Sequence, residues 1–170
     1  MKTVFTIVLL FMMSVAWTQE FPSLSLTTLN DEDLQLPDDF SSRYTLIFLP
    51  LEQEQQDDFT TWEAYVLGEV EARANLDFMQ ILLIGDMNFL LKGIISNAMK
   101  AAYVDAVQAR TAAVFEKIDP WLEALAVEDT SEMHILLVRD KDVIWRAQGA
   151  FSEGLASEIA ALITPTRPDN

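Results

Sequence analysis

Residues 133–149 place two short apolar runs on either side of an acidic turn, and this pattern restricts the fold most strongly. Residues 134–138 and 143–145 are rich in strand-forming Ile, Leu, Val and Trp, and a polar Arg-Asp-Lys-Asp sequence separates them. Two such runs around so short a turn predict an antiparallel β-hairpin. A helix is expected directly afterwards, over residues 152–163. The end of the chain therefore predicts a β-β-α unit.

Two apolar runs upstream predict the centre of a sheet. Residues 44–51, YTLIFLPL, and residues 78–84, FMQILLI, are almost continuously apolar, as strands buried on both faces are. Between them, apolar residues that include Trp62 recur at helical spacing. A strand-helix-strand crossover makes its two strands parallel. The alternating segment at 21–37 predicts a further hairpin laid beside this sheet.

Residues 88–117 are expected to be mostly helical, with an alanine-rich stretch from Ala98 to Ala113. Small residues aligned on one helical face let another helix approach closely. Two interpretations stay open, namely a core helix packed on the sheet or a docking groove for a partner helix. A short helix should follow, with Asp119 as its cap and Pro120 in its first turn.

The first residues, MKTVFTIVLLFMMSVA, have the pattern of a secretory signal. A basic Lys2 precedes an apolar run over 4–13, which is shorter than the ~20 residues that a membrane-spanning helix needs. We therefore expect residues 1–16 to be a cleaved signal peptide, 17–164 to be one domain and 165–170 to be a flexible tail. The protein is expected to be exported, hence periplasmic or secreted. An uncleaved N-terminal membrane anchor is the alternative.

The chain is strongly acidic, with 27 acidic and 11 basic residues and a formal net charge of -16. Phosphate binding needs clustered Lys and Arg, so the composition argues against a nucleic-acid partner. The same charge opposes binding to anionic membrane surfaces, so no membrane partner is expected after signal cleavage. The acidity suits solubility, and the alternatives are a basic partner or a load of cations.

Residues able to perform covalent or metal chemistry are scarce. The chain has no cysteine and a single histidine, His134, which lies inside an apolar run and is expected to be structural. The acidic stretch at 52–58 lacks the glycine that a calcium loop uses for its sharp turn, so we expect a solvated loop. No metal site and no cofactor are predicted.

From residue 21 onward the expected order is hairpin, strand, helix, strand, helical insert, strand, strand and helix. This order resembles the thioredoxin-like fold, in its peroxiredoxin and thiol-reductase branch with an N-terminal hairpin. The resemblance implies a three-layer α/β/α domain with a central mixed sheet and a helical insert. In that fold the redox cysteines follow the first buried strand, and a cis-proline precedes the final hairpin. The corresponding stretches here, 51–58 and 131–133, contain neither, which excludes thiol-disulfide and peroxide chemistry.

A narrower similarity concerns residues 134–163. HILLVRDKDVIWRAQGAFSEGLASEIAALI is similar to the C-terminal block of the assembly-factor family for mitochondrial ATP synthase. That block has a strand, an acidic turn, an I-R-W-like strand, a Gly-Ala pair and a helix that bears a glutamate. The matching residues are Ile144, Trp145, Arg146, Gly149, Ala150 and Glu158. The similarity implies a non-enzymatic chaperone or assembly role, although the secretory leader departs from a mitochondrial matrix location.

The expected function is therefore that of an exported, non-catalytic thioredoxin-like protein that binds, folds or assembles another protein. The alternatives are a carboxylate- or metal-dependent enzyme on the same fold, or a degenerate peroxiredoxin or thiol-reductase relative. The resemblance implies that a protein or peptide client occupies a groove beside the first helix. Its expected lining is Leu51, Glu52, Gln53, Glu54, Gln55, Ser131, Glu132 and Met133. The oligomeric state is left open.

The signal peptide leads to the first testable prediction. Protein purified from the native host should begin near Trp17, because small residues at 14–16 form the expected cleavage site. Intact-mass measurement checks this. A chain that keeps residues 1–16 and fractionates with membranes would support the anchor instead.

Overall fold

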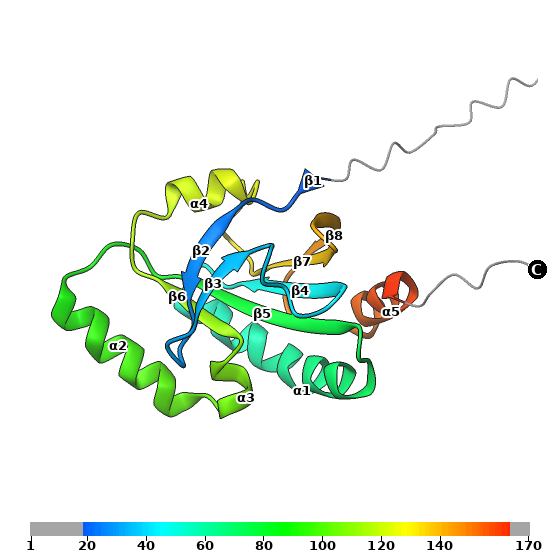
Figure 1. Ribbon diagram of the computed structural model, residues 1–170, viewed down its shortest axis with the longest axis horizontal. Helices are drawn as coiled ribbons and strands as arrows, with labels where there is room; N and C mark the ends of the chain where they lie inside the picture. The colour runs from blue at the N-terminus through cyan, green and yellow to red at the C-terminus, as the bar shows by residue number, and fades with distance from the viewer. Residues whose placement is uncertain (1–18, 164–170) are drawn as a thin grey trace, which may run out of the picture.

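The computed structural model describes residues 19–163, so the predicted signal peptide at 1–16 and the tail at 165–170 lie outside the described residues. A six-stranded sheet forms the centre (Figure 1). Its strands, in spatial order, are β1 (Gln19–Glu20), β8 (Asp142–Gln148), β7 (His134–Arg139), β4 (Tyr44–Leu49), β5 (Leu76–Leu83) and β6 (Thr111–Val114). The run β4-β5-β6 is parallel, whereas β7 is antiparallel to both β4 and β8. The sheet is therefore mixed, as predicted.

In the described part of the chain, five α-helices and a small second sheet surround the centre. The helices are α1 (Gln56–Ala72), α2 (Phe89–Ala102), α3 (Asp105–Gln108), α4 (Asp119–Ala124) and α5 (Glu153–Ile163). The second sheet is an antiparallel hairpin of β2 (Leu24–Thr27) and β3 (Asp33–Leu36). Core residues of α1 and α5 pack on one face of the central sheet, and those of the hairpin and α4 pack on the other. This arrangement gives the expected α/β layers with helices on both faces.

The strand β4 shows why the sheet is at the centre. Its six residues are all buried. Because side chains alternate along a strand, Leu46 and Phe48 enter the core under α1, while Ile47 and Leu49 enter the core under the hairpin. A strand covered on both faces has no polar side, which explains the continuous apolar run in the sequence.

The core under α1 is built around Trp62, which is fully buried. Its ring lies 5.7 Å from the ring of Phe48 and 5.2 Å from that of Phe151, measured between centroids. Its indole N–H donates to the carbonyl of Gly149 at 3.2 Å. The backbone φ of Gly149 is +91°, a conformation that favours glycine. One side chain therefore joins α1, the end of β8 and the approach to α5.

The C-terminal β-β-α unit follows the prediction closely. Arg139 pairs with Asp142, so only Asp140 and Lys141 form the turn of the β7-β8 hairpin. Asp140 has a φ of +57°, which aspartate tolerates better than most residues. Trp62 and Trp121 are buried, and Trp145 in β8 is half-buried.

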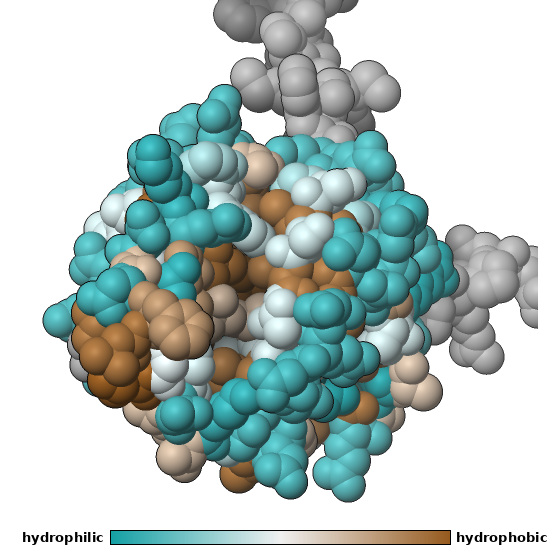
Figure 2. Space-filling view, turned by 60° about the vertical axis from the view of Figure 1, so that its left-hand side comes forward, coloured by the Kyte–Doolittle hydropathy of each residue, from teal (hydrophilic) through white to brown (hydrophobic). Residues whose placement is uncertain are grey.

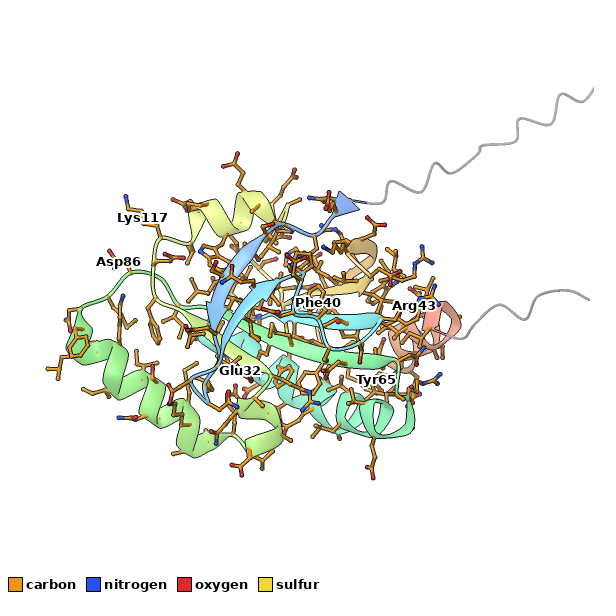
Figure 3. All side chains as sticks on the ribbon, in the orientation of Figure 1. Glu32, Phe40, Arg43, Tyr65, Asp86 and Lys117 are labelled. Atoms are coloured by element: carbon orange, nitrogen blue, oxygen red, sulfur yellow. The ribbon has the colours of Figure 1, made fainter. Side chains whose placement is uncertain are left out.

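The N-terminal hairpin is present but lies across a face of the sheet rather than along its edge (Figure 1). Leu26 and Leu36 point down into the core, and the backbone of Thr28 bridges to Ala112 of β6. Phe40, labelled in Figure 3, follows the hairpin and packs edge-on against Phe21, with ring centroids 5.4 Å apart. The hairpin therefore takes the place of a covering helix on this face.

Residues 88–117 are mostly helical, as expected, but residues 111–114 form a strand that the sequence did not predict. The backbone turns extended at Tyr103 and Val104, and after the short α3 the chain forms the edge strand β6. Alanine favours helix, but hydrogen bonds to β5 and burial of Ala112 decide the conformation here. The core-helix interpretation is wrong, since no residue of α2 is buried.

The first residues of α1 and α4 differ slightly from those expected. The expected loop at 52–58 contains a 3-10 turn at Gln53–Gln55, and α1 already begins at Gln56. Asp119 is the first residue of α4 and makes no capping hydrogen bond, while Pro120 does lie in the first turn. Both differences are shifts of a few residues at helix ends.

The position of Trp62 leads to a stability prediction. Replacing Trp62 with alanine should lower the free energy of unfolding by about 3–5 kcal/mol, since it removes a buried ring and leaves a cavity. Chemical denaturation measures this. The matched control is Trp145→Ala, which removes a half-buried ring and should cost clearly less. Equal losses in the two variants would contradict the central role of Trp62.

Candidate functional site

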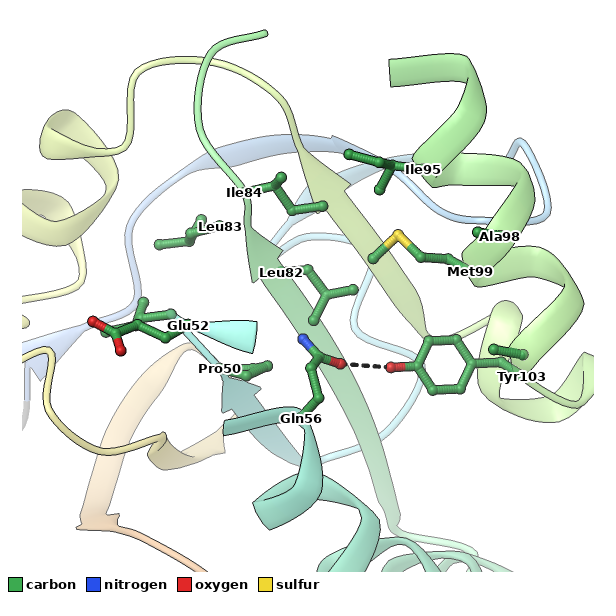
Figure 4. A pocket seen from close by; sticks show the side chains of 12 residues that line it. Pro50, Glu52, Gln56, Leu82, Leu83, Ile84, Ile95, Ala98, Met99 and Tyr103 are labelled. Carbon is green, nitrogen blue, oxygen red and sulfur yellow. Dashed lines mark hydrogen bonds between the residues drawn. The ribbon is translucent and has the colours of Figure 1, made fainter. Parts of the chain in front are cut away.

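A cavity of about 630 Å³ opens beyond the C-terminal ends of β4 and β5, with α2 as its far wall (Figure 4). Pro50, Leu51 and Glu52 lead out of β4 on one side. The floor is formed by residues 82–84 at the end of β5. Ligands in open α/β folds commonly bind at the carboxyl ends of the strands, so the position suits binding.

The sequence of α2 explains the apolar wall. Ile95, Ala98, Met99 and Ala102 follow one another at helical spacing, and all four line the cavity. Two of them are alanine, whose short side chains leave space between α2 and the end of β5. The sequence leaves open whether this face packs in the core or forms a docking groove, and in the structure it faces a cavity.

A polar contact closes one end of the cavity. The Tyr103 hydroxyl donates to Oε1 of Gln56 at 2.8 Å and so joins the end of α2 to the start of α1 (Figure 4). Burial raises the pKa of the Tyr103 phenol above its ordinary value, the Gln80 side chain opposes this shift, and the Glu63 carboxylate adds to it. The phenol is therefore held neutral and acts as a hydrogen-bond donor.

The predicted groove residues are only partly brought together at this cavity. Leu51 and Glu52 line it, with Leu51 half-buried and Glu52 exposed. Gln53 and Glu54 lie in the 3-10 turn next to them, and Glu54 is exposed. Gln55 is buried: its Oε1 accepts from the Leu51 N–H and its Nε2 donates to the Thr130 carbonyl, both at 2.8 Å. It therefore fixes the loop rather than presenting a side chain.

The second predicted segment lies apart from the cavity lining. Ser131 and Glu132 are exposed, and the Ser131 N–H donates to Oδ1 of Asp129 at 2.9 Å. Met133 is fully buried in the core under α1. The sequence did not identify Tyr103, Met99 or the end of β5 as residues that line the cavity. The one pattern that pointed to this region was the alanine-rich helix, which was considered as a docking groove.

The residues of the narrower similarity hold the C-terminal unit together. Trp145 Nε1 donates to Oε2 of Glu158 at 3.0 Å, which joins β8 to α5. Arg146 donates from Nη1 to the Leu125 carbonyl at 2.9 Å, and burial lowers the pKa of its guanidinium. These contacts stabilise the fold and lie outside the cavity lining.

The remaining candidates for chemistry have structural partners. His134 is buried, with its Nε2 next to the Asp129 carbonyl and 3.0 Å from Nε2 of Gln148. Within residues 19–163, no group of three or more His, Asp or Glu side chains is arranged to hold a metal ion. No helix in the same part of the chain has the length and apolar character needed to cross a membrane.

No protein-family model and no curated protein sequence matches this chain, but solved structures do match its fold. A thiol-disulfide oxidoreductase from Bacteroides fragilis is 15% identical over 85% of this chain and 100% of its own, with a TM-score of 0.59. The exposed lipoprotein thioredoxin Etrx1 from Streptococcus pneumoniae is 9% identical over 83% of this chain and 99% of its own, with a TM-score of 0.58. BsSco, a member of the Sco family of cytochrome c oxidase assembly proteins, is 11% identical over 86% of this chain and 93% of its own, with a TM-score of 0.56.

These matches define the fold as thioredoxin-like, with an additional N-terminal hairpin sheet. At such identities the likeness concerns the fold alone. The chain contains no cysteine, so the thiol-redox activity of its structural neighbours is ruled out.

The buried phenol gives a prediction on alkaline pH. The pKa of the Tyr103 phenol should lie above the ordinary tyrosine value of 10.0, because burial in the folded chain favours the neutral form. The free energy of unfolding should then be unaffected by this group below about pH 10, and should fall as the pH rises from there through the raised folded pKa.

Ultraviolet absorbance during an alkaline titration measures this ionisation. Tyr103→Phe should remove one late phase. Burial also raises the pKa of Tyr65, which lies outside the cavity, so Tyr65→Phe should remove a different late phase and leave that of Tyr103 in place. Ionisation of Tyr103 at or below the ordinary phenol value would contradict the buried contact with Gln56.

Proposed function

We propose that the protein is a non-catalytic binding protein that holds a protein or peptide client during folding or assembly. The observation that carries this proposal is the position of the cavity. Leu51, Glu52 and Gln56 line it, and they belong to the stretch that carries the redox cysteines in the thioredoxin-like fold. Losing the thiols removes the chemistry at this place, but an apolar cavity and exposed polar groups remain available for binding.

The lining indicates the kind of client. The cavity wall and floor are mostly aliphatic, so an apolar side chain of the client would enter it. Glu52 lies at the cavity and Glu54 is exposed beside it, with no Lys or Arg among the lining residues. A neutral or basic client segment is therefore favoured over an acidic one.

Two further observations support an assembly role. The fold is shared with BsSco, which is described as a member of a family of cytochrome c oxidase assembly proteins. The second is the resemblance, read from the sequence alone, of residues 134–163 to the C-terminal block of the assembly-factor family for mitochondrial ATP synthase. The leader-like sequence at 1–16 supports proposing that this role is carried out in the periplasm or outside the cell.

A carboxylate- or metal-dependent enzyme is the competing hypothesis. Hydrolysis by paired carboxylates needs two acidic groups that face each other across the substrate. The cavity lining contains one carboxylate, that of Glu52. The geometry therefore favours binding.

A charge-reversal pull-down tests the proposal. The variant Glu52→Lys with Glu54→Lys should lose most of a specific client captured from the native envelope fraction, and capture by the unaltered protein should weaken as salt is raised. The matched control is Glu20→Lys with Glu71→Lys, which makes the same change in net charge at exposed residues outside the cavity. Retention of every partner by the folded Glu52/Glu54 variant, at unchanged yield, would remove the cavity as the binding site.

A further inference from the structure

The cavity between α2 and the end of β5 is larger than one side chain of a client requires. Its volume is about 630 Å³, whereas an apolar cavity of roughly 150 Å³ already holds a benzene ring. Protein sites for small organic ligands measure about 300–1,000 Å³. Figure 2 shows a hollow with apolar surface on this side of the molecule. The cavity therefore has room for a small molecule or for a long aliphatic group.

The lining of the cavity is elongated and aliphatic. The lining residues of α2 extend from Ile95 to Ala102, a length of about 10 Å at a helical rise of about 1.5 Å per residue. Residues 82–84 on the opposite side are also aliphatic, and among the described residues of the lining only Tyr103 is aromatic. Met99 is unbranched and can adapt to a bound chain. These properties suit an extended aliphatic chain, and an octanoyl chain has about the length of the wall.

One end of the cavity presents a hydrogen-bond donor. The Oε1 of the half-buried Gln56 accepts from the Tyr103 hydroxyl, and its Nε2 points away from Tyr103 on the side of the cavity (Figure 4). Within residues 19–163, this Nε2 forms no hydrogen bond. A ligand group at this end must therefore supply an acceptor, and a carbonyl oxygen is a neutral one.

The buried amide of Gln80 supports this orientation of Gln56. The Gln80 side chain is fully buried, and its Nε2 forms no hydrogen bond of ordinary geometry within the described chain. Burial raises the pKa of the Tyr103 phenol, and the Gln80 side chain opposes this rise, as a hydrogen-bond donor does. A phenol oxygen that faces a donor keeps its own proton for Oε1 of Gln56. The three side chains thus direct donors from the sheet toward the cavity.

The charge of the lining favours a neutral ligand at this end. Glu52 is the one charged residue among the described residues of the lining, so an anionic ligand would be repelled. A cationic head group could pair with Glu52, but it would find Oε1 of Gln56 already engaged and would leave Nε2 without an acceptor. Neither charged form of a ligand therefore matches both ends of the cavity.

We propose that the cavity binds an aliphatic chain joined to a neutral carbonyl group, as in a fatty-acid ester or amide. The chain lies between α2 and the end of β5, and the carbonyl oxygen accepts a hydrogen bond from Nε2 of Gln56. This inference rests on the proposed function, because it names the chemical group that the binding cavity takes.

Isothermal titration calorimetry of the purified protein with N-methyloctanamide tests the inference. One molecule should bind per chain, at least about tenfold more tightly than octanoate or octylammonium, whose chains are equally long but whose head groups are charged. Tighter binding of octylammonium would place the head group at Glu52 instead of Gln56 and would overturn the proposal. Absence of saturable binding of N-methyloctanamide would also overturn it.

Two matched pairs of variants locate the bound amide. Gln56→Glu keeps an acceptor for Tyr103 but removes the donor, and it should weaken binding at least about tenfold, whereas Gln35→Glu makes the same change at an exposed residue outside the cavity and should have little effect. Ala98→Phe places a ring in the cavity and should weaken binding similarly, whereas Ala101→Phe changes an exposed residue of α2 outside the lining. Equal affinities within either pair would show that the amide binds elsewhere.

The failure of this inference differs from the failure of the proposed function. If the Glu52/Glu54 variant loses its client while the unaltered chain does not bind N-methyloctanamide, client binding stands and the acyl site is overturned. If the amide binds in a manner that depends on Gln56 while client capture is unchanged, the acyl site is supported and the client does not use the cavity. Release of a captured client by excess N-methyloctanamide would show that the acyl group belongs to the client.

Discussion

Burial of β4 on both faces is the constraint on which the rest of the structure depends. Its six residues supply side chains to both cores and backbone hydrogen bonds to β5 and β7. A strand in this position needs a cover on each face, because exposed apolar area costs roughly 25 cal/mol per Å². The helices α1 and α5 provide one cover, and the N-terminal hairpin with α4 provides the other. The aromatic cluster around Trp62 then fixes how α1 lies on the sheet.

The candidate site arises where this covering stops. Pro50 follows β4 without a backbone N–H to donate, and α2 stands away from the sheet with no buried residue. The apolar end of β5, whose Leu82 and Leu83 are buried, consequently forms the floor of a cavity. The contact between Tyr103 and Gln56 holds one edge of the opening. Binding capacity at this place therefore requires no catalytic group.

The sequence predicted individual site residues less well than it predicted the fold. Leu51 and Glu52 were found because they follow a recognisable buried strand, and the cavity forms at the end of that strand. Gln55 and Met133 were expected in a groove, yet their side chains are buried. Distances along the chain do not show whether a side chain beside a strand end turns outward or inward. That direction depends on neighbours such as Thr130, which are remote in sequence.

The sequence by itself determined the α/β class, the two parallel core strands, both hairpins and the absence of thiol chemistry. These follow from local patterns, namely continuous apolar runs, alternation around polar turns, and composition. Only the tertiary structure decided that residues 111–114 form an edge strand and that α2 stands away from the core. The physical reason is that alanine-rich segments have helical propensity of a few tenths of a kcal/mol per residue, which pairing with β5 outweighs. The cavity forms between α2 and the end of β5, segments that only the tertiary structure brings together, and no local pattern contains it.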